Sequence, residues 1–452
     1  MKLHKLKLKN SLDCLIIDEP FFDSIYLSLF VKVGSYNESY NKNKNCTLGM
    51  AHFCEHLLFA GSNKYNKKGE IFEKAQSIGG KLNAYTADDH TKYYLQYPKK
   101  NEKNAFELLS QMYFCSNFTK SNFEGEKNIV NEEYKQRIDD PETYLYDIKN
   151  IISFKGSRYE TCVPELLEKC TNKYILKDLL NFYFYFYRPE NCYLVYCGKK
   201  DRETINYLNK YFDKKWPHKY CRNEKSIKLI EQPKWISSNI YPKKNECPNF
   251  IKKILPNVDF YHFKRNVNKV YFILFINSNF EYKNLFEKQC LEILSLCTGG
   301  YMSSRLMNKL RIKKSLIYSI DSNIISNKKI KNSFNTCFNL SSSAANENYK
   351  ECITLLIKEL FNIYKNGFTS DEVESAKKYL IGNFIYGFEN IEDISHFFGI
   401  NKIIDNKLYS KNKNIKTIEK IRLKDINNIC KKVMLFENIQ IVNITNKHLH
   451  LI

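Results

Sequence analysis

The chain has 452 residues, of which 43% are hydrophobic and 15% aromatic, so it can bury more than one core and is not a disordered chain. Its formal net charge of +22 suggests nucleic-acid or anionic-membrane binding as a function class. However, the basic residues are scattered and form no dense block, which argues against a nucleic-acid partner. No apolar run approaches the roughly 20 residues that a membrane span needs.

The cysteine pattern bears on the compartment. Fifteen Cys with irregular spacing and no Cys-x-x-Cys pair predict free thiols rather than a disulfide framework. The first ten residues, MKLHKLKLKN, are basic but lack the apolar core of a secretion signal. We therefore expect an intracellular, cytosol-like reducing compartment. The mitochondrial matrix is the alternative, although no clear presequence is visible.

The first half of the chain alternates strand and helix patterns. Segments 12–18 and 24–34 are β-rich runs separated by a turn. A helix is expected to begin with Thr47 as its N-cap and to stop at Gly61–Ser62. Segment 69–80 has helical periodicity and ends in two glycines, and 81–98 alternates as a strand would.

The second half repeats this order. Segments 270–278 and 315–325 are predicted strands, with a helix at 285–297 between them, and 439–445 is a strand near the end. The Pro-rich, aperiodic stretch 221–248 is the expected linker. The sequence thus predicts an α+β fold of two related domains, 1–220 and 249–452, each an antiparallel-rich sheet packed with helices.

The segment HFCEH carries the strongest chemical signal. On a helix, His52 and His56 project from one face, with Glu55 beside them. Two imidazoles and a distant carboxylate suit a catalytic zinc, and Glu55 would then be the general base for a water. The inverted His-x-x-Glu-His order is a known metallopeptidase motif. The alternative is an ordinary helix with two surface histidines, or a core helix with a satisfied histidine.

This motif resembles that of the pitrilysin-type, mitochondrial-processing-peptidase-like zinc metallopeptidases. In that family a glutamate ligand follows the second histidine by about 77 residues, and here 133 − 56 = 77 falls on Glu133. The resemblance makes His52, His56 and Glu133 the ligands of one zinc ion per chain, with Glu126 orienting a ligand histidine. Glu132 is the competing ligand, and a solvated acidic helix face is the other interpretation.

Two further segments resemble the same family. GGKLNAYTADDHTKYY resembles an edge strand whose Asn83 and Ala84 bind the substrate backbone, although Asn83 alone could be a turn residue. In the second half, Arg311 and Tyr318 match an Arg and a Tyr that bind substrate carbonyls and stabilise the oxyanion; the other interpretation of Tyr318 is a plain strand aromatic. Cys54, inside the motif, points to the far side of the helix, where it would pack.

The resemblance implies a zinc-dependent endopeptidase acting on peptides or flexible, unfolded protein segments. It also implies half of a clamshell, and hence a homodimer or a heterodimer with a related chain. One alternative is a catalytically inactive or partner-dependent scaffold subunit of the same family. Another is an anion- or nucleic-acid-binding protein with a structural metal.

Overall fold

The computed structural model describes residues 1–38, 47–155, 162–216, 242–326 and 336–446, and these residues form two compact units. The first unit contains the described residues within Met1–Gln136, Pro164–Ile236 and Tyr386–Tyr409. The second unit contains those within Arg137–Val163, Ser237–Ile385 and Ser410–Ile452.

The first unit is built on a six-stranded sheet of order β1-β2-β6-β3-β5-β4. Its strands are β1 (Lys2–Lys7), β2 (Asp13–Asp18), β3 (Ser24–Val31), β4 (Lys81–Thr86), β5 (Thr91–Pro98) and β6 (Cys192–Gly198). Strands β2 and β6 are parallel, and the other neighbours are antiparallel. Strand β4 therefore lies at one edge of this sheet.

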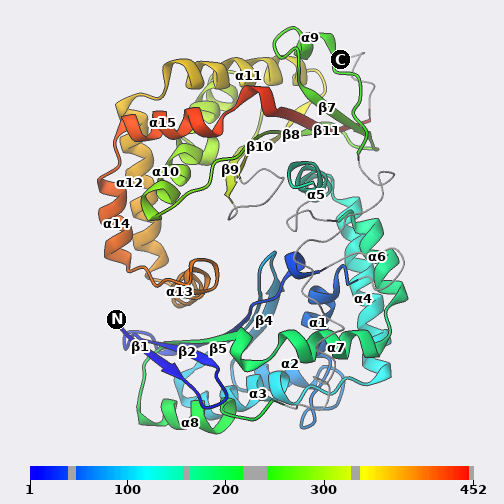
Figure 1. Cartoon of the computed structure of the whole chain (residues 1–452), viewed down its shortest axis with the longest axis vertical. Helices are drawn as coiled ribbons and strands as arrows, with labels where there is room; N and C mark the ends of the chain where they lie inside the picture. The colour runs from blue at the N-terminus through cyan, green and yellow to red at the C-terminus, as the bar shows by residue number, and fades with distance from the viewer. Residues whose placement is uncertain (39–46, 156–161, 217–241, 327–335, 447–452) are drawn as a thin grey trace. The chain divides into compact units, whose positions relative to one another are not determined.

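Helices cover both faces of the first sheet. They are α1 (Met50–Phe59), α2 (Glu70–Ser77), α3 (Glu102–Phe114), α4 (Lys120–Asp139), α6 (Pro164–Lys173), α7 (Leu176–Phe186), α8 (Arg202–Phe212) and α13 (Ile391–Asp405). Helices α1, α2 and α3 pack beneath β4 and β5, whereas α13 crosses the opposite face against β3 and β6 (Figure 1). A buried layer forms under α13 because alternate residues of β3, such as Tyr26 and Phe30, point towards it.

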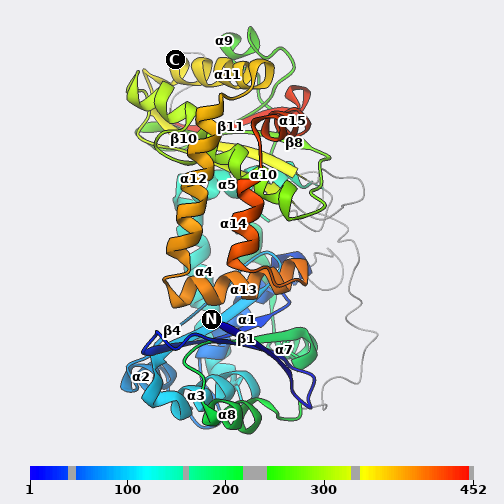
Figure 2. The ribbon, with the colours of Figure 1, turned by 90° about the vertical axis from the view of Figure 1, so that its left-hand side faces the viewer.

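The second unit has a five-stranded sheet of order β7-β11-β8-β10-β9. Its strands are β7 (Asp259–Lys264), β8 (Lys269–Ser278), β9 (Ile320–Ser326), β10 (Thr336–Ala345) and β11 (Ile439–Thr445). Its helices are α5 (Pro141–Ser153), α9 (Asn249–Lys252), α10 (Leu285–Ser295), α11 (Tyr349–Asn366), α12 (Ser370–Gly387), α14 (Lys411–Glu419) and α15 (Leu423–Val433). Helices α11 and α15 lie on one side of the sheet and α5 on the other (Figures 1 and 2).

The two sheets repeat one topology. In β2-β6-β3-β5-β4 and in β7-β11-β8-β10-β9, the first pair is parallel and the remaining pairs are antiparallel. The predicted α+β fold with two related domains is therefore confirmed.

The units do not follow the expected boundaries of 1–220 and 249–452. Helix α5, from the first half of the chain, packs on β8 and β11, and α13, from the second half, packs on β3 and β6. An apolar helix face predicts burial but does not say which sheet the helix will cover. Of the expected linker, residues 221–241 lie outside the described residues, and 242–248 form neither helix nor strand.

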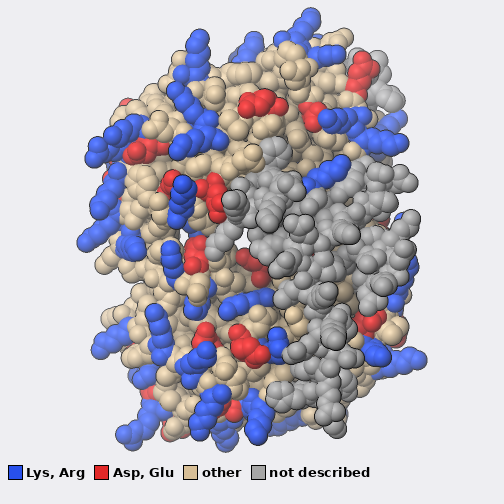
Figure 3. Space-filling view, viewed as in Figure 1, with Lys and Arg blue, Asp and Glu red and all other residues tan. Residues whose placement is uncertain are grey.

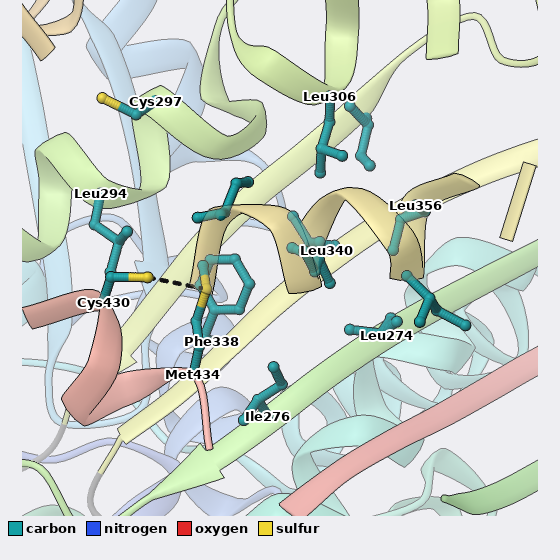
Figure 4. Packing of buried hydrophobic residues seen from close by; sticks show 14 of the residues in the cluster. Leu274, Ile276, Leu294, Cys297, Leu306, Phe338, Leu340, Leu356, Cys430 and Met434 are labelled. Atoms are coloured by element: carbon teal, nitrogen blue, oxygen red, sulfur yellow. Dashed lines mark hydrogen bonds between the residues drawn. The ribbon is translucent and has the colours of Figure 1, made fainter. Parts of the chain in front are cut away.

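The core of the second unit shows why these strands form. Leu274 and Ile276 of β8 and Phe338 and Leu340 of β10 are fully buried and point towards the helices above them (Figure 4). These residues lie at alternate positions of each strand and therefore face the same side of the sheet, whereas the intervening Ile273 and Phe275 of β8 are buried on the other side. Gly367 follows the last residue of α11 with a φ of 76°, a conformation that glycine adopts readily.

Cysteine pairing departs from expectation at one position. Twelve of the described cysteines are free thiols, but Cys170 in α6 is disulfide-bonded. Sequence spacing does not report which sulfur atoms meet in space, because bonding depends on Cα separation in the fold.

Surface charge is dispersed. On the face shown in Figure 3, Lys and Arg side chains are spread among Asp and Glu rather than gathered in one patch. Among the described residues, no helix is both long and apolar enough to cross a membrane.

Candidate metal centre

Helix α1 places both histidines on one face, and its start is held from outside the helix. The helix begins at Met50 after Gly49, whose φ of 83° lies in the left-handed region that favours glycine. The predicted cap, Thr47, is not the N-cap. Instead, Glu38 accepts hydrogen bonds from the backbone N–H groups of Gly49 (2.7 Å) and Ala51 (2.8 Å).

Helix α4 brings two glutamates to these histidines. Glu126 and Glu133 are seven residues apart, about two helical turns, so both face α1. Glu133 Oε2 lies 3.3 Å from His52 Nε2 and 3.5 Å from His56 Nε2. Glu126 Oε2 lies 3.3 Å from His56 Nδ1, on the other side of the ring.

The donor set fits a zinc ion. One ligand atom from each of His52, His56 and Glu133 lies within 4.8 Å of the others, and the two Nε2 atoms are 3.3 Å apart. Tetrahedral coordination at zinc–nitrogen distances of 2.0–2.1 Å would separate the ligand atoms by about 3.3 to 3.4 Å. The spacing, the two imidazoles and the single carboxylate therefore match a three-ligand zinc site.

Electrostatics also favour a cation at this position. Burial lowers the pKa of His56, but hydrogen bonds to Glu126 and Glu133 outweigh it and raise that pKa to about 9. Hydrogen bonds to His52 and His56 hold the pKa of Glu133 well below its usual range. The two carboxylates thus attract positive charge, and a metal would compete with the proton on His56.

Glu55 lies beside the ligands without belonging to their cluster. Its side chain is buried, with 8% of the residue exposed, and Oε2 accepts a hydrogen bond of 2.7 Å from the Thr86 hydroxyl. Burial raises the pKa of Glu55, while the charges of His52 and the hydrogen bond from Thr86 lower it. A carboxyl group whose pKa is raised towards neutrality suits a general base.

The surroundings of Glu132 and Cys54 distinguish them from the candidate ligands. Glu132 is exposed and forms an ion pair with Lys135 at 2.7 Å, as a solvated helix face would. Cys54 is fully buried, and burial raises the pKa of its thiol well above the usual value, so it packs as an inert residue.

Asn83 and Ala84 lie in the edge strand β4, and Asn83 is not a turn residue. Asn83 is exposed, and its Oδ1 accepts a hydrogen bond of 2.8 Å from the backbone N–H of Ala84. Within the described residues, β4 pairs with β5 alone, so its outer edge is suited to β-augmentation.

Arg311 and Tyr318 lie together in the second unit. The Arg311 guanidinium is 4.7 Å from the centre of the Tyr318 ring. Tyr318 is 80% exposed and precedes β9, which begins at Ile320, so its interpretation as a strand aromatic is wrong. Tyr318 therefore presents its hydroxyl to solvent beside the Arg311 guanidinium.

Two residues that contact this centre were missed by sequence reasoning. Glu38 caps the helix that carries the histidines, and Thr86 binds Glu55. The Glu38 contacts span 11 and 13 residues and the Thr86 contact spans 31, and neither residue lies in a motif with a fixed spacing to the histidines. No sequence signal would have found them.

Comparison with known proteins gives the family of this chain. Residues 14–158 match the family described as Insulinase (Peptidase family M16), and residues 174–380 match the Peptidase M16 inactive domain. The uncharacterized zinc protease YmxG of Bacillus subtilis is 23% identical over 427 residues, covering 94% of each chain. Insulin-degrading enzyme of Homo sapiens is 26% identical over 209 residues, 45% of this chain and 20% of that protein. The crystal structure of a protease from Helicobacter pylori superposes with a TM-score of 0.77 at 19% identity, covering 98% of this chain and 99% of that one.

The chain combines helices with two sheets, matches both M16 domains and carries a His-x-x-Glu-His helix. These features together define the class of the protein. The chain belongs to peptidase family M16, with the two-domain fold of that family. Relatives that span nearly its whole length are named zinc proteases.

Proposed function

We propose that this chain is a zinc-dependent endopeptidase that cleaves peptides or flexible protein segments. The observation that carries the proposal is the convergence of His52, His56 and Glu133 within 4.8 Å, with the buried Glu55 beside them. A structural zinc usually takes four protein ligands. A three-residue set next to a carboxyl group of raised pKa favours catalysis instead.

Each residue of the candidate site would have a separate role in peptide hydrolysis. Zinc, when bound, would polarise the scissile carbonyl and make a water acidic near neutral pH. Glu55 accepts the proton of that water and delivers it to the leaving amine. Glu126 holds His56 through Nδ1, which leaves Nε2 directed at the ligand cluster.

The substrate-binding roles follow from the family. An extended peptide would pair with the outer edge of β4, with Asn83 and Ala84 contacting its backbone. Arg311 and Tyr318 would donate hydrogen bonds to the carbonyl oxygen as negative charge develops on it. The position of the Arg311 guanidinium over the Tyr318 ring, together with the exposure of Tyr318, supports this role.

The assembly and the compartment are further parts of the proposal. We expect a homodimer, or a heterodimer with a related chain, in an intracellular compartment. Mass measurement of the purified chain in solution separates the two kinds of assembly.

The test is cleavage of a mixed peptide library by the purified chain and by Glu55→Gln. Wild type should cleave, chelation should abolish cleavage and added zinc should restore it, and Glu55→Gln should bind zinc without cleaving. A chain that binds zinc but cleaves nothing, alone or with a related chain, would favour the inactive-scaffold alternative.

A further inference from the structure

The loop-side end of the edge strand contacts the candidate base. Thr86, the last residue of β4, places its hydroxyl 2.7 Å from Glu55 Oε2. Among the described residues, no hydrogen bond engages the other carboxyl oxygen, Oε1. The protein therefore anchors one oxygen of Glu55 and leaves the other available.

The hydroxyl protons available at this position determine the direction of the hydrogen bond between Thr86 and Glu55. The neighbouring hydroxyl, that of Thr91, donates to the carbonyl oxygen of Val33 at 2.8 Å, so Thr91 has no further proton to donate to Thr86. Thr86 Oγ1 lies 3.5 Å from Thr91 Oγ1, and Thr86 has one proton to give. An ionised carboxylate only accepts, so Thr86 donates to Glu55 Oε2.

The strand end that carries Thr86 is itself fixed. In the loop after β4, Asp88 accepts hydrogen bonds from the hydroxyls of Ser35 (2.9 Å) and Tyr36 (2.8 Å). The backbone carbonyl of Asp88 also accepts from the N–H of Tyr36 at 2.8 Å. Because the loop is held at both its side chain and its backbone, Thr86 has little freedom to move away from Glu55.

We propose that Thr86 is a positioning residue: its hydroxyl holds Glu55 Oε2, which presents Oε1 for proton transfer and ties the base to the strand that binds substrate. This role rests on the proposed peptidase function. Glu55 lies on α1 and the substrate would pair with β4, so without Thr86 the base could rotate independently of the bound peptide. Proton transfer is sensitive to such misplacement, and an error near 1 Å can reduce the rate about 100-fold.

The experiment compares Thr86→Val, Thr86→Ser and Thr91→Val in the full chain. Valine keeps the shape and β-preference of threonine but removes the hydroxyl, whereas serine keeps it. Thr91→Val is the matched control, because it deletes the buried hydroxyl opposite Thr86, which donates to the Val33 carbonyl oxygen and lies 3.5 Å from Thr86 Oγ1 but does not contact Glu55. Thr86→Val should lower kcat by about 10- to 100-fold, with KM and zinc content within about twofold of wild type. Thr86→Ser should restore kcat.

A second readout does not depend on activity. In the metal-free chain, Thr86→Val should lower the thermal midpoint in the wild-type background by more than it does in a Glu55→Ala background. Equal shifts in the two backgrounds would show that the hydrogen bond does not form in solution and would overturn the proposal.

The outcomes distinguish this role from the proposed function. If wild type cleaves peptides but Thr86→Val has the kcat of Thr91→Val, positioning by Thr86 is wrong and the peptidase function stands. If Thr86→Val loses zinc, the hydroxyl has a structural role instead, which also overturns the proposal. The wild type could cleave nothing even though the effect of Thr86→Val on the thermal midpoint depends on Glu55. The proposed peptidase function is then wrong, and the positioning role of Thr86 in catalysis is wrong with it.

Discussion

Removal of Glu38 tests how the metal helix is held. The Glu38 side chain is buried and accepts the backbone N–H groups of Gly49 and Ala51 at the start of α1, where no side chain of the helix provides a cap. Glu38→Ala would leave these two buried donors without an acceptor. At about 1–2 kcal/mol for each of the two donors, the cost is about 2–4 kcal/mol.

The effect should be local, because α1 is a short helix in one of two units. Amide hydrogen exchange in α1 should therefore accelerate by roughly 30- to 900-fold in Glu38→Ala, because a loss of about 2–4 kcal/mol raises the equilibrium constant for local opening by that factor. Zinc affinity, measured by competition with a chelator, should fall as well, since His52 and His56 lie on this helix. Glu38→Gln keeps one acceptor oxygen and should show about half of the loss.

The same site predicts a pH dependence. Burial raises the pKa of Glu38 from 4.5 to about 8, although the hydrogen bonds from Gly49 and Ala51 oppose this. Between pH 4.5 and about 8, Glu38 is protonated in the folded protein but ionised in the unfolded chain. Raising the pH therefore destabilises the fold, by at most about 1.4 kcal/mol per pH unit. The contribution is complete below pH 4.5 and is lost as pH rises through 8. Glu38→Gln should remove this slope.

Glu132→Ala is the control for Glu38. It also removes one carboxylate, but from an ion pair with Lys135 that is exposed and screened by solvent, so it should have little effect on stability. If exchange in α1 is as slow in Glu38→Ala as in Glu132→Ala, the cap does not hold the helix and the reasoning above is refuted.

Three further substitutions probe other parts of the molecule. Glu126→Gln weakens the hold on His56 Nδ1 and should lower zinc affinity about 10- to 100-fold in a chelator competition; an unchanged affinity would contradict this orienting role. Gly399→Ala places a Cβ 2.3 Å from the Phe30 ring and should destabilise the first unit by about 1–3 kcal/mol, seen as a lower unfolding temperature. No change there would mean that α13 does not pack on this sheet in solution. Leu340→Ala opens a cavity in the second core and should cost about 2–5 kcal/mol in denaturant unfolding while zinc affinity stays the same; a loss of zinc would show that the units are coupled.

The sequence by itself determined the features that depend on regular spacing. The spacing of four positions from His52 to His56 and of seven from Glu126 to Glu133 places each pair on one helical face whatever the rest of the fold does. Short runs rich in β-branched and aromatic residues likewise predicted strands such as β8 and β11. Local geometry repeats with a fixed period, so these features can be read without knowing any distant contact.

The tertiary structure alone decided which distant segments meet. Glu38 replaces Thr47 as the cap of α1, Thr86 reaches Glu55 from another element, and α5 and α13 each cover the sheet of the other half of the chain. A carboxylate, a hydroxyl or an apolar helix face can be satisfied by many partners, and its chemistry does not select one of them. The choice depends on packing summed over the whole chain, which no short stretch of sequence contains.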